Sequence, residues 1–144
     1  MAFPNNRSLI RAIAAVHRGL YRVSGGRVGA SLAGKPMLLL TTRGRKSGRE
    51  RTTPLLYHRD GDEFIVVASN GGDPRHPAWY LNLRSDPTVR VQVGSRRVVC
   101  LARVATPEER ARLWPALLAR YPGYSDYEKR AGREIPVVVL RPQA

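Results

Sequence analysis

The sequence predicts a mainly β protein with flanking helices (an α+β fold), in which six antiparallel strands curl into a small barrel. Three observations support this fold class. The chain has 144 residues, of which 42% are hydrophobic, so it can fill one core and form one folded domain. Six short segments have strand character, and most are joined by tight turns. Tight turns favour antiparallel pairing, and six such strands favour a barrel.

The first element is a basic amphipathic helix over residues 8–23. Four side chains form its apolar face: Leu9, Ile13, Val16 and Leu20. Four cations form the opposite face: Arg7, Arg11, Arg18 and Arg22. Such a helix can pack on the domain, lie on an anionic lipid surface or bind a partner. We separate residues 1–26, which hold this helix, from a barrel domain over residues 27–144.

Three strands are expected next. Residues 37–42 are an apolar run, and residues 52–58 return from it as the second strand of a hairpin. The Asp60-Gly61 dipeptide is typical of a tight turn and leads into a third strand over residues 63–69.

A short helix and two more strands continue the fold. Pro77 favours the start of a helix over residues 78–84, because its ring suits the first helical turn. Residues 88–93 and 97–104 alternate between apolar and polar side chains, so they are predicted to pair across a glycine-serine turn.

The last elements are a capped helix, a shorter helix and a strand. Thr106, Pro107 and Glu109 have the spacing of a capping box with proline at the first helical position, and the helix should extend to about residue 120. A shorter helix over residues 125–131 and a strand over residues 135–140 follow. Pro136 indicates an edge position for this strand, because proline cannot donate a ladder hydrogen bond.

The formal net charge of +14 is concentrated near the N-terminus. Residues 1–49 contain ten basic and no acidic side chains, whereas residues 50–144 contain fifteen basic and eleven acidic ones. Such a charge is compatible with nucleic-acid binding. We nevertheless expect no nucleic-acid partner, because the sequence has no nucleic-acid motif and no aromatic residues interleaved with the basic cluster.

Other features favour a cytoplasmic location. No apolar run approaches the roughly 18–20 residues of a membrane span, and arginines interrupt any candidate signal peptide. Cys100 is the only cysteine, which fits a reducing compartment, and in the middle of a strand we expect it to be an inert core thiol. We expect no metal site, because the histidines are scattered. The basic helix adds a peripheral position on the inner face of the cell membrane as a hypothesis.

Residues 42–48, Thr-Arg-Gly-Arg-Lys-Ser-Gly, are the most suggestive segment for ligand binding. Glycines let the backbone approach a ligand closely, and the three cations can hold a phosphate or a carboxylate. The spacing is not that of a Walker loop. The alternative is an ordinary solvated hairpin turn.

Two further segments contain aromatic side chains that can line a pocket. Small residues over positions 68–72 precede Trp79, which can wall a pocket or belong to the core. Tyr121, Tyr124 and Tyr127 recur every three residues, and their hydroxyls can orient a substrate or the rings can simply pack. No nucleophile constellation is evident, so we expect any chemistry to come from a bound organic cofactor.

Three stretches resemble the deazaflavin-dependent nitroreductase family of actinobacteria and its relatives. They are residues 38–55 (Leu-Leu-Leu-Thr-Thr-Arg-Gly-Arg-Lys-Ser-Gly-Arg-Glu-Arg-Thr-Thr-Pro-Leu), residues 68–83 (Ala-Ser-Asn-Gly-Gly-Asp-Pro-Arg-His-Pro-Ala-Trp-Tyr-Leu-Asn-Leu) and residues 121–127 (Tyr-Pro-Gly-Tyr-Ser-Asp-Tyr). The likeness extends over about residues 37–142. It implies a split β-barrel, similar to FMN-binding barrels, that uses coenzyme F420, a deazaflavin.

The resemblance also implies roles for individual residues. Lys46 and Arg51 would hold the phosphate and acidic tail of the coenzyme, with Arg43 and Arg45 as helpers. The surface under the deazaflavin ring would be formed by four residues: Pro54, Ala68, Ser69 and Trp79. Asn70 is a departure in this cofactor-binding set, because the family often has lysine there, and the change removes a phosphate contact.

The acceptor pocket would be lined by Tyr121, Tyr124 and Tyr127, with Tyr127 hydrogen-bonding the acceptor. We therefore expect an oxidoreductase that transfers a hydride from reduced F420 to a quinone, a nitroaromatic compound or an enone. The alternative is a split-barrel protein that binds a ligand without turnover or uses FMN, the less favoured cofactor. Because related flavin barrels commonly dimerise, a homodimer is a further expectation.

Overall fold

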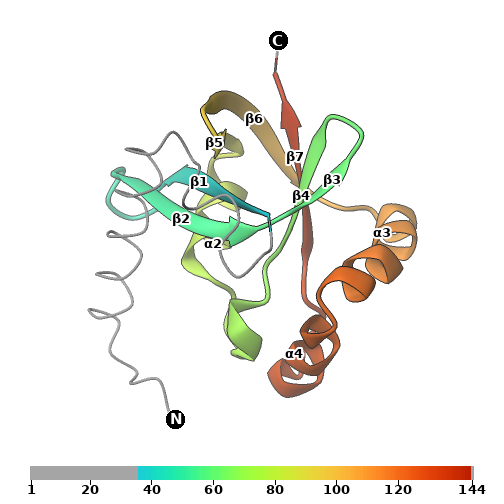
Figure 1. Ribbon diagram of the computed structural model, residues 1–144. Helices are drawn as coiled ribbons and strands as arrows, with labels where there is room; N and C mark the ends of the chain where they lie inside the picture. Colours follow the sequence, from blue (N-terminus) through green and yellow to red (C-terminus); the bar gives the residue numbers. More distant parts are fainter. Residues whose placement is uncertain (1–35, 144) are drawn as a thin grey trace.

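The structure is a computed structural model that describes residues 36–143, and the helix expected over residues 8–23 lies outside the described residues. The described chain forms one seven-stranded sheet with three α-helices and a short 3-10 turn (Figure 1). The strands are β1 (Met37–Arg43), β2 (Glu50–Leu56), β3 (His58–Asp60), β4 (Glu63–Val67), β5 (Thr88–Val93), β6 (Arg96–Val104) and β7 (Val137–Pro142). The helical elements are η2 (Asn70–Gly72), α2 (Ala78–Ser85), α3 (Pro107–Arg120) and α4 (Gly123–Ala131).

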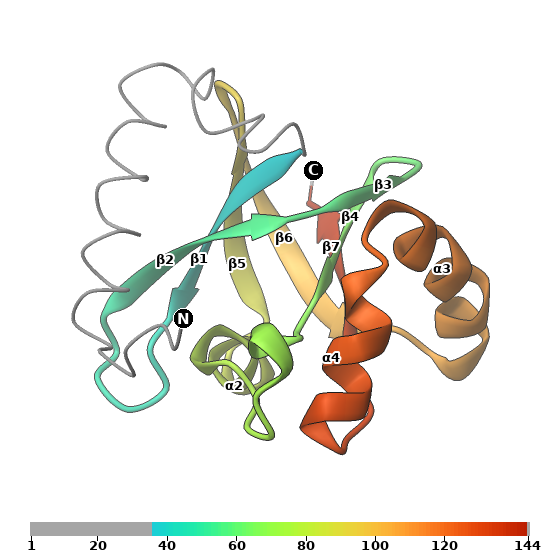
Figure 2. The same cartoon turned by 60° about the horizontal axis from the view of Figure 1, so that its bottom comes forward.

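The sheet curls into a half-barrel whose two edges are joined by the chain itself. Its order is β2-β1-β5-β6-β7-β4-β3, and every pairing is antiparallel. The edge strands β2 and β3 are consecutive in the chain and meet at Tyr57. One continuous ribbon therefore crosses from one edge of the sheet to the other, as Figure 2 shows. The predicted mainly β, antiparallel fold is confirmed.

The prediction of six strands is wrong, because the expected strand over residues 52–58 is two strands. On one side of Tyr57, Leu56 of β2 lies opposite Met37 of β1. On the other side, His58 of β3 lies opposite Ile65 of β4. Strands twist as they extend, so a long ribbon that starts on one neighbour leaves it and meets another.

The expected edge position of the last strand is also wrong. Strand β7 is paired on both sides, with β6 and with β4. Pro136 costs no ladder hydrogen bond there because it precedes the strand, and its carbonyl accepts from the Ala68 backbone N–H at 3.0 Å. The proline that does occupy an edge strand is Pro54 in β2.

Strands β4 and β7 are buried on both faces and separate two hydrophobic cores. Alternate residues of each strand point to opposite sides. Phe64, Val66, Val138 and Leu140 face the barrel interior, where Trp79, Tyr80 and Leu83 of α2 also pack. Their neighbours face a second core that is completed by α3, α4 and the preceding loop: Ile65, Val67, Leu113, Leu117, Tyr121, Tyr124, Ile135, Val137 and Val139. Two-sided burial explains the continuous apolar run near the C-terminus.

The helices begin and end close to their predicted positions. Thr106 caps α3 as predicted: its Oγ1 accepts from the Glu109 N–H at 3.2 Å, and the Glu109 carboxylate accepts from the Thr106 N–H at 3.0 Å. In Figure 2, α2 lies at one end of the barrel, while α3 and α4 lie together on the side of β4 and β7. No helix among residues 36–143 is long and apolar enough to cross a membrane.

Candidate functional site

The basic turn between β1 and β2 is tightly hydrogen-bonded. The Gly44 N–H donates to the Arg49 carbonyl at 2.7 Å, and the Gly48 N–H donates to the Gly44 carbonyl at 2.8 Å. Gly48 has a φ of 71°, a conformation that favours glycine. The backbone of the turn is therefore held in one shape while its cationic side chains are exposed to solvent.

A buried asparagine attaches this turn to α2. Asn82 is only 4% exposed. Its Oδ1 accepts from the Arg45 backbone N–H at 3.1 Å, and its Nδ2 donates to Thr42 Oγ1 at 3.2 Å. Sequence reasoning missed Asn82, although an asparagine one residue before the buried Leu83 was a usable signal. A buried amide needs partners on both of its atoms, and the turn supplies them.

Most cations of the turn have no partner of opposite charge among residues 36–143. Within the described part of the chain, no carboxylate lies within ion-pair distance of Arg45, Lys46 or Arg51. Arg43 differs, because its Nε lies 3.8 Å from Asp86. Exposed cations that pair with no carboxylate of the described residues can offer their donors to an anionic ligand.

A cavity of about 420 Å³ lies at the start of α2, the helix that Asn82 attaches to the basic turn. It is bounded by β2, the end of β4, the loop that contains η2 and the first turn of α2, and its lining residues are Thr53, Leu55, Val67, Ser69, Asn70, Gly71, Pro77, Ala78 and Trp79. Its volume is within the usual range of small-molecule sites. Trp79 is 7% exposed and also belongs to the barrel core, so it is both pocket wall and core.

The cavity brings together part of the predicted coenzyme site. Ser69, Asn70 and Trp79 line it. Arg51 is on the same face of β2 as the lining residues Thr53 and Leu55, because side chains alternate along a strand.

The other predicted coenzyme residues do not line this cavity: the four cations Arg43, Arg45, Lys46 and Arg51, and two of the residues predicted under the ring, Pro54 and Ala68. Pro54 pairs with Leu39 and lies on the opposite face of β2. Ala68 is fully buried in the barrel core.

The three tyrosines form one cluster in the second core rather than in the cavity. The rings of Tyr121 and Tyr124 are 5.4 Å apart, and those of Tyr124 and Tyr127 are 6.3 Å apart. Tyr121 and Tyr124 are buried, and burial raises the pKa of both phenols. Tyr127 is partly exposed, so its hydroxyl is the one of the three best placed to meet a ligand.

The loop that follows β4, residues 68–75, joins the cavity to the tyrosine cluster. Gly72 has a φ of 85°, and a Cβ built on it would lie 3.4 Å from the Tyr127 Cα of α4. The same loop is held by Arg133, which sequence reasoning also missed, because no motif marks a lone arginine after a helix. Cavity and tyrosines are thus on two sides of one loop.

Comparison with known proteins decides which family this site belongs to. The model of a family described as F420H(2)-dependent quinone reductase matches residues 14–142. The chain belongs to this family. It is similar to an F420H(2)-dependent quinone reductase of Mycobacterium tuberculosis, with 44% identity over 129 residues, which are 87% of either chain.

Two solved structures agree with this membership. A structure described as an F420-H2 dependent reductase has 40% sequence identity and a TM-score of 0.68, and the match covers 74% of this chain and 94% of that one. A second, described as a domain-swapped dimer, has 35% identity and a TM-score of 0.70, over 88% of this chain and 96% of that one. The F420H2-dependent quinone reductase family comprises oxidoreductases that use reduced coenzyme F420. Membership therefore confirms the predicted family, enzyme class and coenzyme, and it does not support the FMN or non-catalytic alternative.

The lone cysteine of this family member is part of the core. Cys100 is fully buried, and burial raises the pKa of its thiol to about 11. A thiol with such a pKa is almost entirely protonated at neutral pH and is a poor nucleophile. The expectation of an inert thiol is confirmed.

Proposed function

We propose that this protein is an F420H2-dependent reductase that binds the coenzyme across the basic turn and the Trp79 cavity and passes a hydride to a quinone. Nitroaromatic compounds and enones are further acceptors of the same chemistry. One observation carries the assignment of the site. Exposed cations that have no carboxylate partner among residues 36–143 lie on β2 and its preceding turn, and β2 and α2, to which that turn is attached, also bound a cavity of about 420 Å³ whose wall is an indole ring. That arrangement suits a ligand with a flat ring and an anionic tail.

The residues present fit such a coenzyme. Lys46 and Arg51 supply charge-assisted donors to the phosphate and the acidic tail, with Arg45 and Arg43 beside them. Ser69 and Trp79, which line the cavity, would lie against the ring. Pro54 and Ala68 support this surface from the opposite face of β2 and from the core, rather than by ring contact.

The protein contributes to the reaction mainly by positioning the coenzyme ring and the acceptor. When bound, the reduced deazaflavin supplies a hydride, so no acid–base pair is needed for that transfer. The walls of the cavity exclude water, and a fixed ring placement supplies the proximity on which the rate depends. We assign Tyr127 to hydrogen-bonding the acceptor, with Tyr121 and Tyr124 as the buried support behind it.

Substitution of Lys46 tests the anion-binding part of the proposal. Lys46→Ala removes one charge-assisted contact, so F420 should bind about tenfold more weakly at low salt, and less of this difference should remain at high salt. Fluorescence titration with F420 measures the dissociation constant. Lys129→Ala is the matched control, because it removes another exposed lysine that lies on α4 rather than in the basic turn.

Two results would overturn the proposal at different levels. Unchanged F420 affinity in Lys46→Ala at low salt would remove the turn from the site. Failure of the wild-type protein to bind F420 and to oxidise F420H2 with menadione would overturn the function itself.

A homodimer is a separate proposal. It is supported by exposed apolar side chains on β6: Val99 and Leu101, which share one face of the strand, are 44% and 46% exposed, and Val104 at the end of the strand is 40% exposed. Exposed apolar groups that cluster on one strand are typical of an interaction surface. Sedimentation equilibrium of the wild type and of Leu101→Glu tests it, and a dimer that Leu101→Glu dissociates is expected. A monomeric wild type at tens of micromolar protein would contradict it.

Peripheral binding to the inner face of an anionic membrane is proposed for residues 1–26, which lie outside the described residues. Support comes from the sequence alone, in the arginine face opposite an apolar face. Flotation with anionic liposomes should carry the full chain upward and leave a variant without residues 1–25 behind. Equal flotation of the two proteins would remove the idea.

A further inference from the structure

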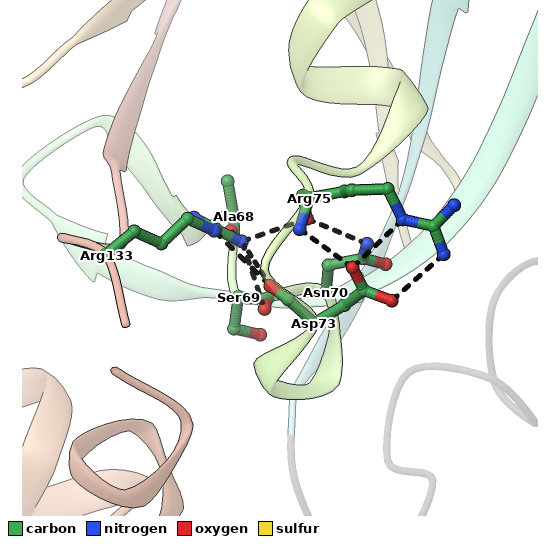
Figure 3. A network of polar contacts seen from close by, with 6 residues as sticks. All are labelled: Ala68, Ser69, Asn70, Asp73, Arg75 and Arg133. Carbon is green, nitrogen blue, oxygen red and sulfur yellow. Dashed lines mark hydrogen bonds and ion pairs between the residues drawn. The ribbon is translucent and has the colours of Figure 1, made fainter. Parts of the chain in front are cut away.

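The Arg133 guanidinium holds the 68–75 loop, which forms a wall of the cavity (Figure 3). Nη2 donates to the carbonyls of Asp73 at 3.2 Å and Arg75 at 3.1 Å. Longer contacts reach the carbonyls of Ala68 at 3.4 Å and Ser69 at 3.5 Å. Nε donates to the Asp73 carbonyl at 3.3 Å. One side chain thus holds both the beginning and the end of the loop.

Arg133 differs from most arginines in that its contacts are with backbone carbonyls rather than with a carboxylate. Among the described residues, no carboxylate lies within ion-pair distance of Arg133, and its Nη1 is buried without a hydrogen-bond partner. The charge is therefore balanced by carbonyl dipoles of the loop. The contacts to Ala68, Ser69 and Asp73 are partly buried and the one to Arg75 is exposed. Because the donor is charged, these hydrogen bonds are stronger than neutral ones and constrain the loop backbone.

Apart from those of Arg133, the hydrogen bonds among residues 69–75 are short-range ones. Asn70, Gly71 and Gly72 all have positive φ values of 48°, 64° and 85°. Two of these three residues are glycine, which adopts many backbone conformations. This stretch of the loop therefore has many alternatives to the conformation observed. Within the loop, the Gly72 N–H donates to the Ser69 carbonyl at 3.0 Å and the Asp73 N–H donates to the Asn70 carbonyl at 3.1 Å. Asn70 Nδ2 donates to the Arg75 carbonyl at 3.0 Å, and the Arg75 N–H donates to Asp73 Oδ1 at 2.7 Å.

The same arginine ties the loop to α4. Arg133 directly follows Gly132, which ends α4 with a φ of 64°. A second contact lies at Gly72, where a Cβ would be 3.2 Å from the Arg130 Cδ and 3.4 Å from the Tyr127 Cα. The spacing between the cavity wall and the helix that carries Tyr127 is therefore set at two points.

We propose that Arg133 is a positioning residue: its fork of donors fixes the 68–75 loop and the distance of that loop from α4, and so sets the placement of the coenzyme ring relative to the acceptor. This inference rests on the proposed function for its consequence in binding and turnover. Its structural half, an ordered loop, is independent of that function.

Hydrogen exchange of the full chain without coenzyme tests the structural half. In Arg133→Ala, the amides of Gly72 and Asp73 should exchange about tenfold faster or more, because loss of the guanidinium lets the turn open. Arg133→Lys keeps the charge but not the planar fork, so it should show most of the same increase. Arg112→Ala is the control, because it removes an exposed guanidinium bonded to Asp60 at 2.9 and 3.0 Å and should leave these amides unchanged.

Binding and kinetics test the functional half. F420 should bind Arg133→Ala and Arg133→Lys about tenfold more weakly, and kcat with menadione should fall in both. If the role of Arg133 were merely structural, the melting temperature would fall, but Arg133→Lys would not share the loss of F420 affinity and kcat. If Arg133→Ala does not fold, Arg133→Gln takes its place, since its amide can still donate to two of the carbonyls.

The outcomes separate the inference from the proposed function. Unchanged exchange at Gly72 and Asp73, or F420 affinity within twofold of the wild type in both variants, would overturn the role of Arg133. A wild type that binds no F420 would overturn the proposed function, and the exchange experiment would still decide whether Arg133 orders the loop.

Discussion

Asn70 shows how one residue serves both the backbone and the site. It lines the cavity, and its φ of 48° is a left-handed conformation that asparagine tolerates better than most side chains. Its Nδ2 donates to the Arg75 carbonyl at 3.0 Å, which helps to close the loop. The amide thus suits the loop geometry at a position where a lysine would add charge to the site.

Asn70→Lys should improve coenzyme binding and weaken the fold. The added ammonium faces an anionic ligand, so F420 should bind about three- to tenfold more tightly at low salt, and the gain should shrink as salt is added. The loss of the Asn70 side-chain bond and the strained φ should cost about 1 kcal/mol of unfolding free energy. F420 titration and urea denaturation measure the two effects.

Asn70→Gln is the control for this prediction, because it disturbs the loop without adding charge. It should show the stability loss without the gain in affinity. Equal F420 affinity in the wild type and in Asn70→Lys at low salt would contradict the placement of the anionic part of the coenzyme near this residue.

At the residue scale, the sequence was most informative where local chemistry repeats known patterns. The cluster of cations around Lys46 was recognisable because charges and glycines lie close together in the chain. Asn82 and Arg133 were not, because each acts on residues 37 to 65 positions away. A single polar residue at such a distance leaves no periodic signal in the sequence.

At the scale of elements, the start of α3 is a structure that sequence spacing alone predicts. The Glu109 carboxylate accepts from the Arg103 guanidinium, with Nη2 at 2.8 Å, and from the Thr106 N–H. These bonds, first of all the one from Arg103, lower the pKa of Glu109 to about 2. A carboxyl with a lowered pKa binds fewer protons in the folded than in the unfolded state.

Acid should therefore remove the contribution of Glu109 to stability. That contribution is complete above the unfolded pKa, near 4.5, and is lost as the pH falls toward about 2. Glu109→Gln should be less stable than the wild type at neutral pH, and the difference should shrink steadily below about pH 4.5. Urea midpoints across this range measure it. A difference independent of pH would show that the carboxylate charge is not involved.

Element boundaries were less predictable where the cause lies outside the element. The division of residues 52–58 into β2 and β3 depends on which strand each half meets, and β4 begins after both. The position of β7 in the middle of the sheet likewise depends on pairing with β4 and β6. Composition gives strand character, but partners far along the chain decide the register and the place in the sheet.

At the scale of the whole molecule, the two edges of the half-barrel are joined through one residue. Tyr57 lies between the two edge strands, and its ring meets Phe64 of the barrel core at a centroid distance of 5.7 Å. Its N–H donates to the Pro36 carbonyl at 3.3 Å, and its own carbonyl accepts from Tyr121 Oη at 3.3 Å. The junction therefore connects the barrel, its first strand and the helical side that carries the tyrosine cluster.

This geometry predicts different effects for two tyrosines of the cluster. Tyr121→Phe deletes the hydroxyl that donates to the Tyr57 carbonyl, so unfolding free energy should fall by about 1 kcal/mol while F420 affinity and the KM for menadione stay within about twofold. Tyr127→Phe deletes the hydroxyl of the partly exposed ring, so menadione turnover should fall while stability is nearly unchanged. Thermal denaturation and steady-state kinetics of both variants give the comparison. The reverse result, a stable Tyr121→Phe with impaired turnover beside a fully active Tyr127→Phe, would place Tyr121 at the acceptor and remove it from the junction of the two edges.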